Sequence, residues 1–137
     1  MNDQETIRDL QIRYCQCFDA RDGDGYGAIF TEDGVLTLPG DRRVVGREEL
    51  RKMARRAPPG GWHKALETTI AVTRDQGTGV CRFEAQGLDG RLLVGRYEDT
   101  YARIAGEWKI ASRIAVVESS SNDAPGGPAD DSVTVSA

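Results

Sequence analysis

Four long strands are predicted within residues 62–117, which read WHKALETTIAVTRDQGTGVCRFEAQGLDGRLLVGRYEDTYARIAGEWKIASRIAVV. Apolar and polar side chains alternate through most of this segment, which is the period of a half-buried strand. Short glycine-containing separators interrupt the alternation and are typical of hairpin turns. They divide the segment into strands over residues 62–73, 79–88, 92–104 and 108–117. Successive hairpins imply an antiparallel meander.

Helices are predicted before these strands. Residues 3–20 have a helical period, since Ile7, Leu10, Tyr14 and Phe18 recur at spacings of three and four. A short helix over 26–30, strands over 35–38 and 43–45, and a helix over 47–56 follow. This order indicates an α+β fold, in which one curved, mainly antiparallel sheet wraps around N-terminal helices. Residues 1–118 then form one domain, and residues 119–137 are predicted to be a flexible tail.

The composition is that of a globular protein with a single core. The chain has 137 residues, of which 39% are hydrophobic and 29% are charged, and this length is typical of one domain. No apolar run is long enough to span a bilayer, and the N-terminus lacks the basic start and apolar stretch of a signal peptide. We therefore expect a cytoplasmic protein without a membrane partner.

The net charge of −4 comes mainly from the C-terminal segment, because residues 1–118 hold 18 basic and 19 acidic side chains. Binding to nucleic acid normally needs a basic excess on one face, so no nucleic-acid partner is predicted. Three cysteines without a secretory signal argue against a disulfide framework. Cys15 and Cys17 are two residues apart on a helix and would point to different sides, so the thiols are interpreted as structural.

Motifs for metals and cofactors are weak. Asp22, Asp24 and Asp33 have the spacing of part of a calcium-binding loop, but Tyr26 occupies a ligand position and a strand pattern replaces the exiting helix. The chain has one histidine, His63, which rules out multi-histidine metal sites. We predict neither a metal nor a cofactor.

Two polar residues stand in unusual places. Asp19 lies in the last turn of the first predicted helix, where a carboxylate opposes the negative end of the helix dipole, and beside Phe18 at the edge of the apolar face. An unfavourable placement of this kind often marks a functional group. Arg13 and Arg21 offer the alternative of an ordinary ion pair at a helix end. His63 opens the first long strand, where it could be structural or catalytic.

Six segments carry a recognisable pattern. They are residues 14–22 (YCQCFDARD), 30–34 (FTEDG), 46–50 (GREEL), the strand opening at His63, 95–101 (GRYEDTY) and 106–113 (GEWKIASR). Together they resemble the SnoaL-like branch of the nuclear transport factor 2-like superfamily, over about residues 3–116. The resemblance implies a cone-shaped pocket between a strongly curved sheet and the helices. The superfamily hosts unrelated functions, and its members include scytalone dehydratase, bile-acid dehydratases, ketosteroid isomerase and polyketide cyclases.

The dehydratase members imply roles for particular residues. In them a Tyr, and an Asp five residues later, face a His at the start of the first long strand, and Tyr14, Asp19 and His63 occupy those positions. The His moves a proton, the Asp orients and charges it, and the Tyr polarises a substrate oxygen; Tyr26 matches a second pocket tyrosine. The chain departs from the pattern by lacking a second catalytic His and by having Glu67 where the family often has Asn.

These roles imply a cofactor-free lyase or isomerase, such as a dehydratase, cyclase or double-bond isomerase. The substrate would be an apolar cyclic molecule, polyketide- or steroid-like, and the reaction would use Asp/His general acid–base proton transfer. Besides the catalytic residues, the side chains expected to contact the substrate are Tyr26, Phe18, Phe30 and Leu36.

Alternatives remain open from the sequence. One is a non-catalytic binding domain or the small subunit of a larger enzyme, such as a ring-hydroxylating dioxygenase. Another is epoxide hydrolysis, with Asp99 beside Arg96 or Arg113. Consecutive residues are apolar in the segments 92–94 and 114–117, so apolar side chains point to both faces of the predicted sheet. This predicts burial of the outer face as well, and hence a homodimer or homotrimer formed through that face.

Overall fold

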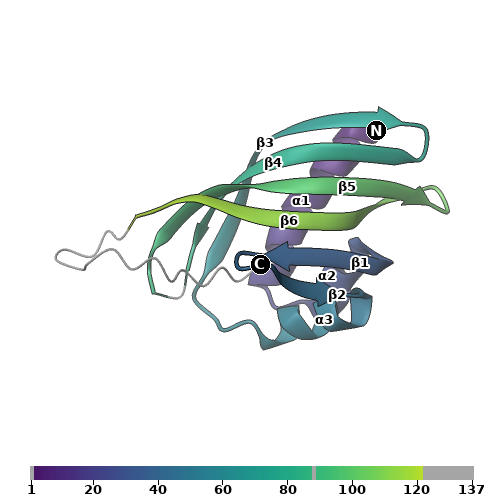
Figure 1. The fold of residues 1–137 in the computed structure, drawn as a ribbon. Helices are drawn as coiled ribbons and strands as arrows, with labels where there is room; N and C mark the ends of the chain where they lie inside the picture. The colour runs from purple at the N-terminus through teal and green to yellow at the C-terminus, as the bar shows by residue number, and fades with distance from the viewer. Residues whose placement is uncertain (1, 88, 122–137) are drawn as a thin grey trace.

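The computed structural model describes residues 2–87 and 89–121, which form three helices and a six-stranded sheet (Figure 1). The elements are α1 (Asp3–Asp19), α2 (Gly23–Ala28), β1 (Phe30–Leu38), β2 (Arg42–Val45), α3 (Arg47–Arg56), β3 (Trp62–Thr73), β4 (Gln76–Gln86), β5 (Leu92–Ile104) and β6 (Glu107–Ser121). The α+β class predicted from the sequence is confirmed. Within the described residues, no helix is both long and apolar enough to cross a membrane.

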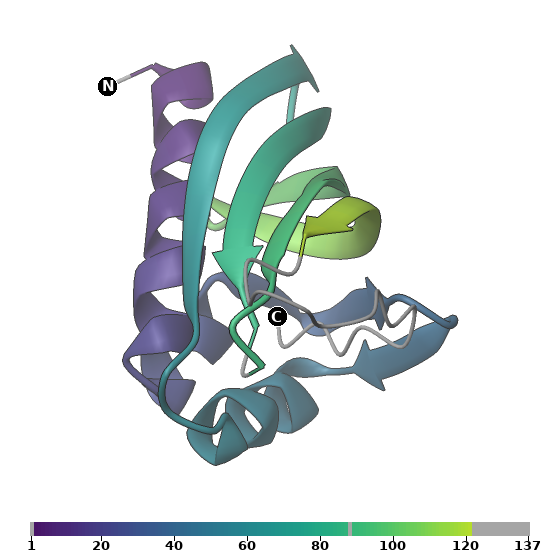
Figure 2. The same cartoon turned by 90° about the vertical axis from the view of Figure 1, so that its left-hand side faces the viewer.

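The sheet is open, curved and mixed, with the strand order β2-β1-β6-β5-β4-β3. The four long strands pair antiparallel, as the hairpin turns predict. β1 pairs antiparallel with β2 but parallel with β6, which joins the two ends of the chain in one sheet. α1 lies against one face of the sheet and runs beside β3 (Figure 2). This arrangement brings the end of α1 close to the start of β3.

Several element boundaries differ from the predictions, among them the starts of α2, β1 and β4; β4 runs over Gln76–Gln86 instead of residues 79–88. The second helix begins at Gly23 instead of residue 26, because the Asp22 side chain caps it by accepting a hydrogen bond from the Gly25 N–H at 3.0 Å. β1 begins at Phe30 instead of residue 35. Its register with β6 shifts between Phe30 and Val35, and this irregularity hides the strand from an alternation pattern.

The end of β6 also differs from the prediction. Residues 119–121, predicted to begin the tail, extend β6 and lie opposite residues 92–94 of β5. Three consecutive serines give no apolar signal, so the pairing rests on backbone hydrogen bonds that side-chain pattern does not reveal. The remainder of the predicted tail, residues 122–137, lies outside the described residues.

The core lies between α1 and the inner face of the sheet, and it is rich in aromatic rings. The fully buried rings are those of Tyr14, Tyr26, Phe30, Phe83 and Tyr97. Phe83 and Tyr97, from the neighbouring strands β4 and β5, stack with ring centroids 4.4 Å apart. Cys15 and Cys81 are buried free thiols. The interior therefore offers an apolar, aromatic environment to any group that α1 or the inner sheet face presents to it.

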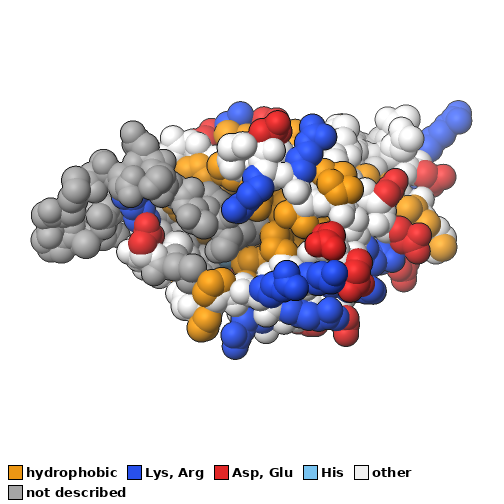
Figure 3. Space-filling view, turned by 60° about the horizontal axis from the view of Figure 1, so that its bottom comes forward, with side chains coloured by type: hydrophobic (Ala, Val, Ile, Leu, Met, Phe, Trp, Pro, Cys, Tyr) orange, Lys and Arg blue, Asp and Glu red, His pale blue; other side chains and the backbone are white. Residues whose placement is uncertain are grey.

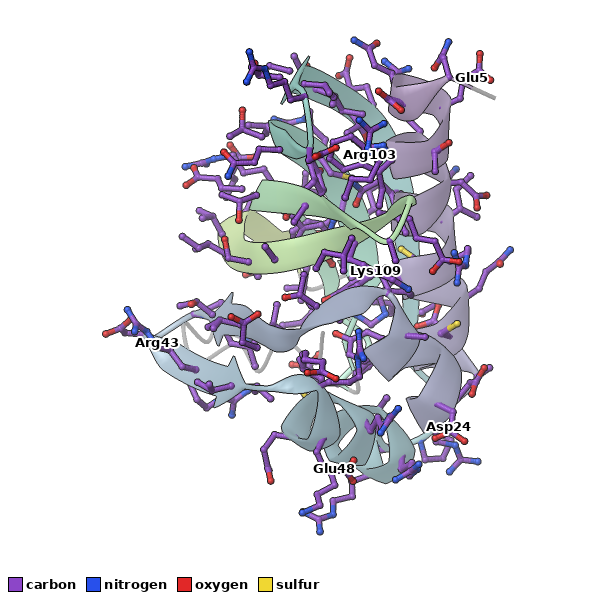
Figure 4. The ribbon with its side chains drawn as sticks, turned by 90° about the vertical axis from the view of Figure 1, so that its right-hand side faces the viewer. Glu5, Asp24, Arg43, Glu48, Arg103 and Lys109 are labelled. Atoms are coloured by element: carbon purple, nitrogen blue, oxygen red, sulfur yellow. The ribbon has the colours of Figure 1, made fainter. Side chains whose placement is uncertain are left out.

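Glycines allow α2 and α3 to pack closely. A Cβ at Gly23 would lie 2.6 Å from the Arg55 side chain, and a Cβ at Gly27 would lie 2.6 Å from the Arg51 side chain. The aliphatic parts of both arginines therefore occupy the space that larger residues of α2 would need. At the exposed edge of this contact, Asp24 pairs with Arg55 at 2.6 Å; Figure 4 labels Asp24.

Gly95 stands where β5 and β6 approach closely. The register between the two strands shifts between Val94 and Gly95. A Cβ at Gly95 would clash with the carbonyl oxygen of Val116 and lie 2.9 Å from the Phe83 ring. Glycine in a strand often marks such a close approach or a bend, so this position contributes to the curvature of the sheet.

Replacement of Gly95 by Ala should therefore destabilise the fold. We expect Gly95→Ala to lower the free energy of unfolding by about 1–3 kcal/mol, because the backbone of two strands must move apart. Urea denaturation followed by circular dichroism measures the loss. Gly77→Ala is the control, since its Cβ would meet the nearest atom, the Ala71 carbonyl oxygen, only at 3.2 Å. Equal losses for the two variants would contradict this explanation.

The outer face of the sheet carries exposed apolar side chains. Val80 and Ile114 are 40% and 42% exposed, and Val45 in β2 is also exposed. Figure 3, which looks obliquely from below the view of Figure 1, shows hydrophobic side chains gathered in a band bordered by charged ones. The β1–β2 hairpin projects away from α1 and carries Arg43 near its tip (Figure 4). A band of this kind favours contact with another protein surface.

We expect self-association through this outer face, as a homodimer or homotrimer. Ile114→Arg would place an unpaired charge in the contact and should shift the chain toward the monomer in size-exclusion chromatography with light scattering. The control is Ile12→Arg, because Ile12 is exposed on α1, away from the outer sheet face. A wild-type chain that is monomeric at micromolar concentration would refute the expectation.

Candidate functional site

Asp19 is the last residue of α1, and its carboxylate faces the unfavourable end of the helix dipole. The last turn of α1 contains no basic residue. After the cap residue Ala20, Arg21 adopts a positive φ of 55°, which turns the chain away from the helix axis. The Asp19 carboxylate thus stands at a helix end without local compensation, and its partner must come from elsewhere in the fold.

That partner is His63, the second residue of β3. Oδ1 of Asp19 lies 2.6 Å from Nδ1 of His63, and Oδ2 accepts a hydrogen bond from the His63 backbone N–H at 2.8 Å. The side chains are 3% exposed for His63 and 26% exposed for Asp19. The ion-pair partner of Asp19 within the described residues is His63, so the sequence alternative of a pair with Arg13 or Arg21 is not supported.

The two-point contact sets the chemistry of the imidazole. A carboxylate at Nδ1 favours a proton on that nitrogen, so Nε2 is the ring nitrogen that Asp19 does not contact. The hydrogen bond to the backbone N–H prevents the carboxylate from rotating away. The ring of Phe18, also on α1, meets the imidazole edge-on with centroids 5.2 Å apart. The pair is thus oriented as a general base or acid requires, with a charge available to stabilise the imidazolium.

Tyr14 lies deeper in the same helix and is fully buried. Burial raises the pKa of Tyr14 to about 12, although the nearby Arg113 cation acts in the opposite direction. The phenol therefore keeps its proton at neutral pH and is a hydrogen-bond donor. Its ring contacts Tyr26 at 5.1 Å and Phe30 at 6.2 Å between centroids. In this series of rings, two others lie between Tyr14 and His63. Tyr26, which contacts Tyr14, also contacts Phe18 with centroids 5.4 Å apart, and Phe18 contacts His63.

The residues predicted to contact a substrate all lie in the interior. Tyr26, Phe30 and Leu36 have no exposed surface, and Phe18 is nearly buried. Tyr26 and Phe30 contact one another with centroids 5.4 Å apart. The structure places these side chains beside the Tyr14 ring or the His63 ring, or within the same core. Their role in binding a substrate stays a prediction.

The interior contains a network of buried polar side chains. The sequence pointed to one pair in this network, Asp99 with Arg113, and missed the rest. Nε and Nη2 of Arg113 both donate to Asp99 at 2.8 Å, and Nη2 also donates to Oε1 of Gln11. Nε2 of Gln11 donates to the Tyr101 hydroxyl at 2.8 Å, and that hydroxyl donates to Asp99 at 2.7 Å. Burial alone would lower the pKa of Arg113, but the Asp99 carboxylate raises that pKa well above its ordinary value.

This network bears on the epoxide hydrolase alternative. Asp99 and Arg113 do lie together, as that alternative requires, but Asp99 is the carboxylate that pairs with Arg113 within the described residues. Arg96, the other arginine considered, pairs instead with Glu98 and Glu118 on the opposite face of the sheet. The structure therefore excludes Arg96 as a partner of Asp99. Within residues 2–87 and 89–121 no second acid pairs with Arg113, so these residues do not assemble a triad of two acids and one arginine.

Possible metal ligands are scattered. Within residues 2–87 and 89–121, no three side chains of His, Cys, Asp or Glu lie close enough together to hold one metal ion. Asp22 and Asp24, which suggested a calcium loop, have other roles, since Asp22 caps α2 and Asp24 pairs with Arg55.

Solved structures with the same fold include proteins of varied description. A Mycobacterium tuberculosis protein of unknown function is 29% identical, with 82% of this chain and 70% of that chain covered and a TM-score of 0.74. A candidate scytalone dehydratase from Novosphingobium aromaticivorans is 19% identical, with 86% and 85% covered and a TM-score of 0.76. A type 2 hexachlorocyclohexane dehydrochlorinase is 19% identical, with 95% of each chain covered and a TM-score of 0.80. At such identities the last two show a shared fold.

Sequence comparison gives the family. No curated protein sequence matches the chain significantly. A family model described as a SnoaL-like domain matches residues 1–114, which is most of the chain and includes Tyr14, Asp19, His63 and Arg113. The resemblance inferred from the sequence is confirmed by this match and by the shared fold. The chain therefore belongs to the SnoaL-like family.

Proposed function

We propose that the chain is a cofactor-free lyase or isomerase that acts on an apolar cyclic molecule by acid–base proton transfer. The observation that carries this proposal is the two-point contact of Asp19 with His63 at the border of an aromatic interior. A carboxylate placed against a helix dipole costs stability, and a purely structural helix end would not need it. The cost is explained if the carboxylate serves the imidazole.

In the proposed reaction, the two ring nitrogens of His63 have different tasks: Nδ1 contacts Asp19, and Nε2 transfers the proton. Nε2 removes a proton from a carbon next to a carbonyl group, and the electron pair of the broken C–H bond passes into an enolate. Asp19 stabilises the imidazolium that forms. The hydroxyl of Tyr14 donates a hydrogen bond to the oxygen on which negative charge develops. The proton then returns to another carbon in an isomerisation, or goes to a β-hydroxyl that leaves as water in a dehydration.

The neighbours support elimination among these outcomes. A scytalone dehydratase and a hexachlorocyclohexane dehydrochlorinase are both named for reactions that remove a small molecule from a ring compound. Both share the fold of this chain, and fold alone does not carry function. They nevertheless favour dehydration over cyclisation as the first reaction to assay.

A non-catalytic binding domain is the competing proposal. Such a domain would need an apolar interior but no oriented imidazole. The Asp19–His63 contact favours the enzyme, because it provides a proton-transfer group and a counter-charge that simple binding of an apolar ligand does not use.

Loss of the imidazole should remove most of the activity. In assays of cyclic β-hydroxyketones and enones, followed by the absorbance of the conjugated product, we expect His63→Ala to lower turnover by roughly 100- to 10,000-fold. Asp19→Asn should lose a comparable factor, because the amide cannot stabilise an imidazolium by charge. Asp24→Asn is the control, since Asp24 forms an exposed ion pair. Wild-type activity in His63→Ala, with folding verified by circular dichroism, would refute the mechanism.

Loss of the Tyr14 hydroxyl should be milder. We expect Tyr14→Phe to lower kcat on the order of tenfold, because one neutral hydrogen bond to the reacting oxygen is worth about 1 kcal/mol. The ring contacts with Tyr26 and Phe30 should persist, so the melting temperature should stay close to that of the wild type. An unchanged kcat would show that the Tyr14 hydroxyl does not contact the reacting oxygen.

A further inference from the structure

The guanidinium of Arg113 packs against two aromatic rings and is hydrogen-bonded along one edge. Its Cζ lies 4.2 Å from the centroid of Tyr14 and 4.1 Å from the centroid of Tyr97, and these two rings meet edge to face with centroids 5.4 Å apart. Nε and Nη2 both donate to Asp99, and Nη2 also donates to Gln11. Asp99 and Gln11 therefore use two of the three nitrogens, and the side chain is held in one orientation.

The third nitrogen, Nη1, is buried and has no hydrogen-bond partner within residues 2–87 and 89–121. Because Asp99 occupies the edge formed by Nε and Nη2, the two N–H groups of Nη1 point away from that carboxylate. The hydroxyl of Tyr97, whose ring centroid lies 4.1 Å from Cζ of Arg113, is also buried without a partner among these residues. Buried donors are nearly always satisfied, and an unmade hydrogen bond costs free energy.

We propose that Arg113 Nη1 and the Tyr97 hydroxyl form a binding site for an oxygen atom on an apolar ring, namely a carbonyl, enolate or phenolate oxygen. Arginine has donors only, so its ligand must be an acceptor. Asp99 already balances the guanidinium charge, which suits a neutral carbonyl or an oxygen that gains negative charge during a reaction better than a second carboxylate.

The surroundings of the two donors favour a ring as the carrier of that oxygen. From Arg113 a continuous row of rings leads through Tyr14, Tyr26 and Phe18 to His63, with successive centroids 5.1, 5.4 and 5.2 Å apart after the 4.2 Å contact of Arg113 with Tyr14. An apolar ring compound that enters beside this row would meet the faces and edges of aromatic rings, which are favourable contacts for another ring. This inference deepens the proposed function. It rests on that function only in one respect, namely that the bound ring compound is the substrate. The oxygen atom that it concerns is remote from the carbon that His63 deprotonates.

A binding experiment tests the site without any turnover. The probes are 2-naphthol and naphthalene, which have the same ring system and differ by one oxygen; each is titrated into the full chain in a calorimeter. We expect the wild type to bind 2-naphthol roughly tenfold or more tightly than naphthalene, as two hydrogen bonds from buried donors would give. Tyr97→Phe should reduce this preference roughly three- to tenfold and leave the affinity for naphthalene unchanged.

Tyr101→Phe is the matched control. The Tyr101 hydroxyl accepts a hydrogen bond from Gln11 and donates one to Asp99, whereas the Tyr97 hydroxyl has no partner within the described residues. Tyr101→Phe should therefore lower the urea midpoint and keep the preference for 2-naphthol. Tyr97→Phe should keep or raise the urea midpoint while losing part of the preference. This opposite pattern separates a binding role from a structural one.

A paired replacement tests Arg113 itself. Arg113→Met with Asp99→Leu removes the cation together with its counter-ion, so no unpaired charge is left in the core. This variant should lose the preference for 2-naphthol. If Tyr97→Phe and the paired variant both keep the wild-type preference, or if the wild type binds both probes equally, the donors serve water only and the proposal is wrong.

His63→Ala distinguishes this inference from the proposed function. It should abolish turnover and keep the preference for 2-naphthol. If His63→Ala keeps full turnover while Tyr97→Phe loses the preference, the proton-transfer mechanism fails and the oxygen site stands.

Discussion

The buried ion pair of Arg113 with Asp99 is the constraint on which the arrangement of α1 depends. Both side chains are fully removed from solvent, and a guanidinium in such a place is tolerated only with a carboxylate and further acceptors around it. Asp99 supplies the carboxylate from the neighbouring strand. Gln11 supplies the further acceptor from α1, and the ring of Tyr14, one helical turn later, packs with its centroid 4.2 Å from the guanidinium carbon. The helix is thereby fixed in height and rotation against the sheet.

This packing of α1 against the sheet fixes the position of the C-terminal end of the helix. Asp19 follows Tyr14 on the same rigid helix, so fixing Tyr14 over Arg113 also fixes the carboxylate that reaches the first residues of β3. The imidazole of His63 comes from the edge strand β3, three strands away from β6 in the sheet order. The two polar groups of the interior are thus positioned by one helix, and sites held on regular elements are better defined than sites held on loops.

Local pattern was sufficient for much of the fold and for part of the site. The strands over residues 62–73 and 92–104 were predicted at their observed bounds, because alternation and glycine turns are local signals. Asp19 could be singled out because its conflict with the helix dipole is also local. Arg113 could not be placed by alternation, because the register between β5 and β6 shifts between Thr100 and Tyr101. Trp108 and Ile110 face inward before that shift, and Arg113 faces inward after it, at the opposite parity. The parallel pairing of β1 with β6 joins distant segments and likewise has no local signature.

The two pairs of oppositely charged groups in the interior differ in access to solvent, and this difference supports the separate roles that we propose for them. The pair of Asp19 with His63 is reached by solvent through the Asp19 carboxylate, which is 26% exposed, and it stands at the end of the aromatic row. The Asp99 carboxylate is fully enclosed and accepts three hydrogen bonds from two partners, Arg113 and Tyr101, which hold it in place. In the proposed roles, the Arg113–Asp99 pair holds an oxygen in place and the Asp19–His63 pair transfers the proton. A ring compound between them would be oriented by the first pair and altered by the second.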